Sequence, residues 1–146
     1  MDGILNISEA VSLAIHGMVY LADSYNKDGG VVSVKDIAKV FKASEHHLSK
    51  VFQRLVKAGL IRSIRGPHGG FCLARPANRI RLIDVFTAID GELSLNECLF
   101  LNKVCMDGRC IFGSLLKRIN SELFQYLKGK RLSDFRGVYG KEKIGV

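Results

Sequence analysis

Residues 44–81 read SEHHLSKVFQRLVKAGLIRSIRGPHGGFCLARPANRIR, and this stretch decides the fold. Ser44 can cap a helix over residues 45–58, in which apolar residues recur on one face, and Gly59 is placed to end it. Residues 60–65 and 71–75 predict two strands, and the glycine-rich segment between them must turn sharply. The stretch therefore predicts a helix followed by a β-hairpin.

Two further helices are expected before this stretch. Ser8 can cap a helix over residues 9–25, and Ser33 can cap a short helix over residues 34–41. Lys42-Ala43 then leaves only a tight turn before the helix capped by Ser44. Three helices followed by a two-stranded hairpin are typical of a winged helix-turn-helix.

The pattern changes after Pro76. A short helix is expected over residues 82–90, then a cysteine-containing loop, then a long amphipathic helix over residues 111–127. That last helix has no evident partner in so short a chain, so we expect it to pair with a second copy. The predicted fold is mostly α with a small β-hairpin, a winged helix-turn-helix plus a long C-terminal dimerisation helix. Its expected parts are a DNA-binding region (1–80), a sensor and dimerisation region (81–135) and a flexible tail (136–146).

The charge pattern indicates a polyanionic partner. The 146-residue chain has a formal net charge of +8 and a pI of about 9.5, and its 47% hydrophobic content is enough for a core. Residues 50–81 contain no Asp or Glu, whereas a merely solvated basic surface, the alternative, usually mixes both signs. Double-stranded DNA is therefore the expected partner. The cations of this window are Lys50, Arg54, Lys57, Arg62, Arg65, Arg75, Arg79 and Arg81.

Candidate DNA contacts follow from the expected helix-turn-helix. Early residues of its second helix face base edges in the major groove, where Lys50 and Arg54 could reach guanine or phosphate. Arg65 at the entry to a narrow hairpin suits the minor groove. For any one of these residues, the alternative is a solvated position without a base contact. The candidates are Ser33, Ser44, Glu45, His46, His47, Ser49, Lys50, Arg54, Arg65, Gly66, Pro67, His68 and Gly69.

The hairpin carries a specific family resemblance. Gly59-Leu60 followed by the run Arg65 to Phe71 closely resembles the wing of the Rrf-type bacterial transcription regulators. The likeness extends to Tyr20-Leu21-Ala22, to Ile37-Ala38 and to residues 83–89, and it covers roughly residues 4–135. It implies a homodimeric repressor with crossed C-terminal helices, one winged helix per subunit and a palindromic operator.

Cys98, Cys105 and Cys110 form the second candidate site. Three thiols so close in sequence can converge on one metal or cluster, although their spacing fits no standard zinc motif. The resemblance implies that they are ligands of an iron–sulfur cluster, either 2Fe-2S or 4Fe-4S. The spacing is less even than is usual in the family, and Gly113 stands where the iron–sulfur cluster regulator has a histidine ligand.

The resemblance also implies a fourth ligand from the first helix of the partner subunit. Candidates are Glu9, which is favoured on chemistry, and Ser12, which is favoured by alignment, with His16 a further possibility. Other readings of the cysteine loop stay open. The alternatives are thiols without a ligand, a zinc site, a thiol switch, and a loop that docks a partner enzyme as in some family members.

The remaining features predict no catalysis. The sequence has no nucleophile elbow, phosphate-binding glycine loop or paired His-Glu helix motif, so an enzyme is not expected. Cys72 is expected to be a small buried or half-buried apolar residue and His16 a packed core histidine. The sequence shows no signal peptide or membrane span, which predicts a cytoplasmic protein without a membrane partner.

Overall fold

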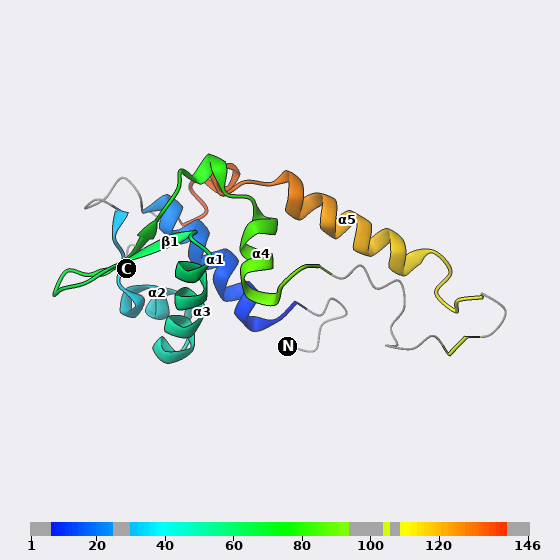
Figure 1. Ribbon diagram of the computed structural model, residues 1–146, viewed down its shortest axis with the longest axis horizontal. Coiled ribbons are helices and arrows are strands. Elements are labelled where there is room, and N and C mark those ends of the chain that lie inside the picture. The colour runs from blue at the N-terminus through cyan, green and yellow to red at the C-terminus, as the bar shows by residue number, and fades with distance from the viewer. Residues whose placement is uncertain (1–6, 25–29, 94–103, 106–108, 140–146) are drawn as a thin grey trace.

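The computed structural model describes residues 7–24, 30–93, 104–105 and 109–139 (Figure 1). Its α-helices are α1 (Glu9–Asp23), α2 (Val34–Phe41), α3 (Glu45–Lys57), α4 (Leu82–Asp90) and α5 (Leu115–Gly129). The strands β1 (Ile61–Ile64) and β2 (Gly70–Leu73) form an antiparallel hairpin, and η2 (Ala77–Arg79) and η3 (Leu132–Phe135) are short 3₁₀ turns. This order confirms the predicted mostly α fold with one hairpin. No helix in these ranges is long and apolar enough to span a bilayer.

Three serines begin the first three helices, as the sequence predicts. The hydroxyl of Ser8 accepts a hydrogen bond from the amide of Val11 at 3.2 Å. Ser33 and Ser44 cap α2 and α3 in the same way, three residues before the donor amide. Each cap satisfies an amide that has no partner inside the helix. Between α2 and α3, Lys42 takes a left-handed conformation (φ 51°), which keeps the turn short.

The core lies where α1, α3, α4 and β2 meet. Phe52 on α3 is fully buried and meets Phe71 of β2 edge to face, with ring centroids 5.2 Å apart. α1 packs against both α3 and α4, and Figure 1 shows it between them. α4 therefore shares the core of the winged helix, although the sequence analysis assigned it to the sensor and dimerisation region (81–135) and not to the DNA-binding region (1–80). Cys72 is buried, as predicted.

His16 is not the packed core histidine that the sequence predicts. Its side chain is exposed, with Nδ1 2.6 Å from the Ser12 carbonyl oxygen and the ring edge-on to Phe41. The buried side of α1 is formed by its neighbours Ala14, Met18 and Val19. His16 lies just outside that apolar stripe.

Helix α5 projects away from the other helices and is attached at its C-terminal end (Figure 1). The backbone on either side of it makes two hydrogen bonds near α4, from Leu82 to the Lys130 carbonyl and from Leu132 to the Ile80 carbonyl, each 3.0 Å. α5 begins at Leu115 and not at the expected residue 111, because Gly113 has a left-handed φ of 57°. Among α5 residues, only Leu127 is buried.

The segment after η3 returns to α1. The carboxylate of Asp23 accepts hydrogen bonds from the amides of Gly137 (3.0 Å) and Tyr139 (2.9 Å). The Tyr139 ring lies 5.6 Å from both Tyr20 of α1 and Phe41 of α2. Residues 137–139 are therefore anchored, where the sequence predicted a flexible tail from residue 136; residues 140–146 lie outside the described ranges.

Candidate nucleic-acid interface

The outer face of α3 is polar and cationic. Its opposite face is buried in the core through Leu48, Val51, Phe52 and Leu55. On the outer side, exposed residues recur every three or four positions, a spacing that puts them on one helix face. They are His46, Lys50, Gln53 and Lys57.

The N-terminal turn of α3 presents several of the predicted contacts. Ser44, Glu45 and His46 are exposed, whereas His47 and Ser49 are half-buried. The Ser44 hydroxyl accepts from the His47 amide at 3.3 Å, which leaves its own O–H proton to donate outward. The amides of such a helix start favour an anion, so this turn suits a phosphate beside a base edge.

A tight turn forms the tip of the hairpin, which we call the wing (residues 61–73). The amide of Gly69 donates to the carbonyl of Gly66 at 2.9 Å, with Pro67 in the second position of the turn, where its fixed φ fits. A Cβ on Gly69 would lie 2.2 Å from the Ile64 carbonyl oxygen, so only glycine fits there. Arg65, Gly66, Pro67 and His68 are all exposed at this tip.

The base of the wing is fixed to the start of α2. Phe71 and Val32 exchange two backbone hydrogen bonds of 2.8 and 2.9 Å. A Cβ on Gly70 would stand 2.2 Å from the Val32 carbonyl oxygen, so this close pairing requires glycine. Ser33, the cap of α2, follows Val32 directly and is thereby held beside the wing base.

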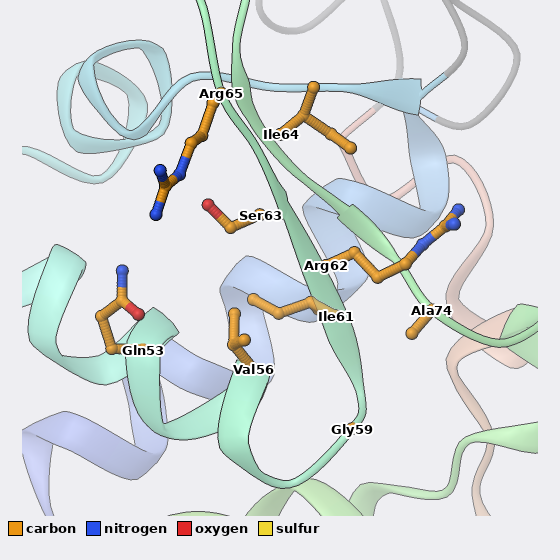
Figure 2. Close-up of a pocket in the computed structure, with 9 residues that line it drawn as sticks. All are labelled: Gln53, Val56, Gly59, Ile61, Arg62, Ser63, Ile64, Arg65 and Ala74. Carbon is orange, nitrogen blue, oxygen red and sulfur yellow. The ribbon is translucent and has the colours of Figure 1, made fainter.

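A groove separates α3 from the wing (Figure 2). Its volume is about 720 Å³, and Gln53 and Val56 of α3 face β1 across it. Ser63 and Arg65 point toward α3, whereas Arg62 points to the other side of the hairpin. Gln53 and Ser63 are not among the sequence candidates. The helical spacing from Lys50 and the alternation of strand residues around Arg65 could have identified both.

Arg54 is exposed one helical turn after Lys50, and its side chain makes a contact within the protein. Its guanidinium Nη2 donates to the main-chain carbonyl of Ile89, in the last turn of α4. A cation there offsets the partial negative charge at the end of a helix. This contact ties α3 to α4, and the expectation that Arg54 reaches guanine or phosphate stays a prediction.

The cations of residues 50–81, the acid-free window, do not all lie on one surface. Arg81 forms a salt bridge of 3.4 Å with Asp84, a residue just beyond the acid-free window in the sequence. Arg79 lies in η2, which contacts η3 near the attached end of α5. Lys50 and Lys57 lie on the α3 face, and Arg65 points toward the groove. Arg62 points to the other side of the hairpin, and Arg75 is exposed near Gly59.

The cysteine candidates lie away from this surface. Cys105 and Cys110 are exposed free thiols, and Cys98 lies outside the described residues. Residues 104–105 and 109–110 lie beyond the free end of α5 and away from α1, the helix of the candidate ligands Glu9 and Ser12 (Figure 1). Glu9 is exposed, and Ser12 Oγ lies 3.4 Å from His16 Nδ1. Within the described ranges, no three metal-binding side chains come together.

Comparison with solved structures supports the winged-helix interpretation. CymR, the global cysteine regulator of B. subtilis, has a TM-score of 0.73 with 28% identity, over 90% of this chain and 96% of that one. The T. potens IscR structure has a TM-score of 0.67 with 25% identity, over 90% of this chain and 86% of that one.

Sequence comparison assigns the family. The Rrf2 model, described as an iron-dependent transcriptional regulator, matches residues 7–136. The HTH-type transcriptional regulator IscR of Xenorhabdus nematophila is 33% identical over 118 residues, which are 80% of this chain and 70% of that protein. These relatives are named as transcriptional regulators and not as enzymes. The chain belongs to the Rrf2 family, and it is a DNA-binding transcription regulator.

Proposed function

We propose that the chain is a cytoplasmic, homodimeric repressor of a palindromic operator, with an affinity controlled by an iron–sulfur cluster on Cys98, Cys105 and Cys110. The observation that carries the DNA-binding part is the α3 face beside the wing, where Lys50, Lys57 and Arg65 lie and Glu45 is the one carboxylate of α3. A surface of this kind gains free energy by releasing counterions from phosphates.

The two parts of this surface have different roles in the proposal. Lys50 and the start of α3, with Glu45 and His46, enter the major groove, where donor and acceptor patterns distinguish all four base pairs. Arg65 and the turn after it enter the adjacent minor groove, whose negative potential attracts a guanidinium. Ser33 and Ser44 donate to phosphates at the helix starts.

The first test is the salt dependence of binding. The full chain selects an operator from a random-sequence duplex library, and its affinity is then measured by fluorescence anisotropy between 50 and 300 mM salt, roughly the range over which phosphate contacts are lost. We expect Lys50→Ala and Arg65→Ala each to weaken binding about tenfold and to lower the slope of log K against log salt by about one per lost phosphate contact.

Arg79→Ala is the matched control. It removes one cation from the same acid-free window but from η2, away from the α3 face and the wing. We expect its affinity and salt slope to stay near those of the wild type. Equal losses for Arg79, Lys50 and Arg65 would mean that only the net charge matters, and the interface would be refuted.

A palindromic operator is expected because the proposed protein is a symmetric dimer. Two copies that pair along α5 carry two α3 helices related by a two-fold axis, and such proteins bind half-sites about 34 Å apart, one turn of DNA. The large exposed side chains at the free end of α5 support this pairing. They include Ile111 (90% exposed), Phe112 and Leu115.

The cysteine loop has the donor chemistry for a cluster. Thiolates are the usual ligands of iron–sulfur clusters, and Cys105 and Cys110 are exposed. Because this segment lies beyond the free end of α5, a fourth ligand from Glu9 or Ser12 would come from a second subunit. When bound, such a group supplies iron–thiolate bonds that are sensitive to redox state. This chain contributes the thiolates and the helix that joins them to the DNA-binding core.

Anaerobic purification tests this part. We expect the wild-type protein to absorb visible light and to contain iron and sulfide, and a Cys105→Ser/Cys110→Ser variant to lose all three. Cys72→Ala is the control, because Cys72 is buried in the wing and should not affect iron content. A colourless, iron-free wild type that still binds its operator tightly would remove the cluster and leave the DNA-binding function intact.

A thiol switch is the second candidate. Two exposed thiols on one segment favour it, and so does similarity to the structure of Staphylococcus aureus CymR in an oxidized form (TM-score 0.68, 26% identity, covering 88% of this chain and 93% of that one). Thiol titration before and after oxidation, with zinc and iron analysis, separates a switch or a zinc site from a cluster. Copurification with a stoichiometric enzyme and no response to iron would indicate docking of a partner enzyme instead.

A further inference from the structure

The segment that follows α5 runs from the end of that helix to α1 and α2. We call residues 132–139, which are η3 and the turns after it, the strap. At its start, Leu132 is fully buried and its amide donates to the Ile80 carbonyl at 3.0 Å. At its end, the amides of Gly137 and Tyr139 donate to the carboxylate of Asp23. The strap is therefore attached beside α4 and again at the last residue of α1.

Tyr139 also joins an aromatic cluster on the last turn of α2. Among the described residues, the ring of Phe41 has three aromatic neighbours, Tyr139, Tyr20 and His16, with centroids 5.6, 6.0 and 6.3 Å away. Such tilted and edge-to-face pairs attract one another beyond the effect of their buried area. Since α2 packs on α3, the ring of Tyr139 connects the strap to the pair of helices that includes α3.

These two attachments restrict how the helices can move relative to one another. Main-chain hydrogen bonds beside Lys130 join the end of α5 to the entry of α4. A long helix held at one place can pivot about that place. The contacts of the strap with Asp23 and with the rings of α1 and α2 lie on other helices, so they oppose the pivot. Hydrogen bonds to a carboxylate are stronger than those between neutral groups, which suits Asp23 to this role.

We propose that the strap is a positioning element for operator binding, which holds α2 and α3 at a fixed angle to α5. Asp23 and Tyr139 are its positioning residues, and they act through α1 and α2 without touching DNA. The inference rests on the proposed dimer, because α5 is the helix through which the two copies pair. It adds the connection that transmits the geometry of this pairing to each α3.

The spacing of the half-sites is the property that the strap should control. One base pair added between two half-sites moves them apart by about 3.4 Å and turns them by about 35° relative to each other. A dimer whose cores are fixed to α5 binds one spacing well. A dimer whose cores pivot accepts neighbouring spacings, but it binds the best spacing less tightly because it loses more orientational freedom on binding. The ratio of the affinities for the selected and the altered spacing, which we call the spacing selectivity, therefore reports on the strap.

The test uses the full chain, the selected palindromic operator, two operators with one base pair added or removed at the centre, and an isolated half-site. We expect the wild type to bind the altered spacings about tenfold more weakly than the selected one. Asp23→Ala and Tyr139→Ala should each lower this selectivity to about threefold or less and weaken binding to the selected operator about threefold. Affinity for the half-site should change less than about twofold, because α3 itself is unaltered.

Tyr139→Phe and Val11→Ala are the controls. Tyr139→Phe retains the ring beside Tyr20 and Phe41, so it should keep the spacing selectivity of the wild type. Val11→Ala removes fully buried atoms near the opposite end of α1, so it should lower stability without changing the selectivity. All variants are compared at a temperature at which circular dichroism shows them to be folded.

Amide hydrogen exchange tests the strap without DNA. Because Tyr139 packs on Phe41 in the last turn of α2, we expect Tyr139→Ala to speed exchange in peptides that cover residues 34–41. Tyr139→Phe and Val11→Ala should exchange there at the rate of the wild type, measured by mass spectrometry.

Three results would overturn the proposal. The first is a spacing selectivity equal to that of the wild type in both alanine variants of the strap contacts. The second is an equal loss of selectivity in Val11→Ala, which would assign the effect to general stability. The third is an equal loss of affinity for the half-site and the palindrome, which would assign it to α3 alone.

Failure of the proposed dimer gives a different result. A wild type that is monomeric, or that binds the palindrome no more tightly than the half-site, would reject the dimer. In that case, unchanged exchange of α2 in Tyr139→Ala would overturn the role of the strap by itself.

Discussion

Gly17 allows α1 and α3 to approach closely. A Cβ added there would lie 2.7 Å from a ring carbon of Phe52, and Phe52 is fully buried. Since the ring has no free space to move into, we expect Gly17→Ala to lower the free energy of unfolding by about 1–3 kcal/mol. Urea denaturation followed by circular dichroism measures this change.

Gly129→Ala is the internal comparison for Gly17→Ala. It changes the last residue of α5, where an added Cβ meets nothing within 4 Å. Alanine is the better helix former, so we expect no loss and a gain of up to about 1 kcal/mol. Equal effects of the two substitutions would show that the contact with Phe52 does not matter.

The local sequence predicts the structural roles of some residues but not of others. The caps Ser8, Ser33 and Ser44 were predictable, because each bonds an amide three residues away. The role of Arg54 could not be predicted in this way, because its acceptor on Ile89 lies 35 residues further along the chain. Basic composition located the cationic surface, but the contact of Arg54 with Ile89 depends on the packing of α4 on α3.

Helices and strands were predicted well where a local signal ends them. α2 and α4 have the expected bounds, 34–41 and 82–90, and α3 ends one residue earlier than expected. The start of α5 was missed, because the apolar pattern continues through Ile111 and Phe112 although Gly113 breaks the helix. The contact of residues 137–139 with α1 and α2 carries no local signal, since Asp23 is more than a hundred residues away.

The anchored segment at residues 137–139 should make stability sensitive to alkaline pH. Burial, with a smaller contribution from Asp23, raises the pKa of Tyr139 above its usual value, and burial with a smaller contribution from Asp36 raises the pKa of Tyr20. A raised tyrosine pKa means that the folded state retains the proton longer than the unfolded state does. The stabilisation is therefore complete below the unfolded pKa of about 10 and is lost as pH rises above it.

Tyr139→Phe separates this titration from packing. It retains the ring against Tyr20 and Phe41 but removes one ionisable group. Between pH 8 and pH 11, we expect the variant to lose less unfolding free energy than the wild type, by urea denaturation at each pH. An identical pH dependence in the two proteins would mean that Tyr139 does not titrate with folding.

Among the described residues, the C-terminal end of α5 connects this helix to the DNA-binding helices. Main-chain hydrogen bonds join the segments beside α5 to the entry of α4, and Arg131 donates to the Asn78 carbonyl at 2.8 Å. Beyond η3, the Asp23 contacts fix the chain to α1. A change in how two α5 helices pair would therefore move each core as a unit and alter the distance between the two α3 helices.

Charge placed on the apolar face of α5 should separate the proposed dimer. Ile119 and Leu123 are one helical turn apart and half-buried on the same face as Leu127. We expect Ile119→Glu/Leu123→Glu to convert the protein from twice the 16.2 kDa of one chain to a single chain in sedimentation equilibrium. Because two α3 helices no longer bind together, affinity for a palindromic operator should fall at least tenfold, while affinity for an isolated half-site changes little.

The control adds the same charge to the opposite side of α5. Ser121→Glu/Gln125→Glu changes two exposed residues that lie away from the Leu127 face. This variant should remain dimeric and retain most of its operator affinity, apart from a modest loss due to repulsion between the added carboxylates and DNA. If both variants stay dimeric, the α5 face does not form the interface, and the spacing of the two α3 helices must be set elsewhere in the chain.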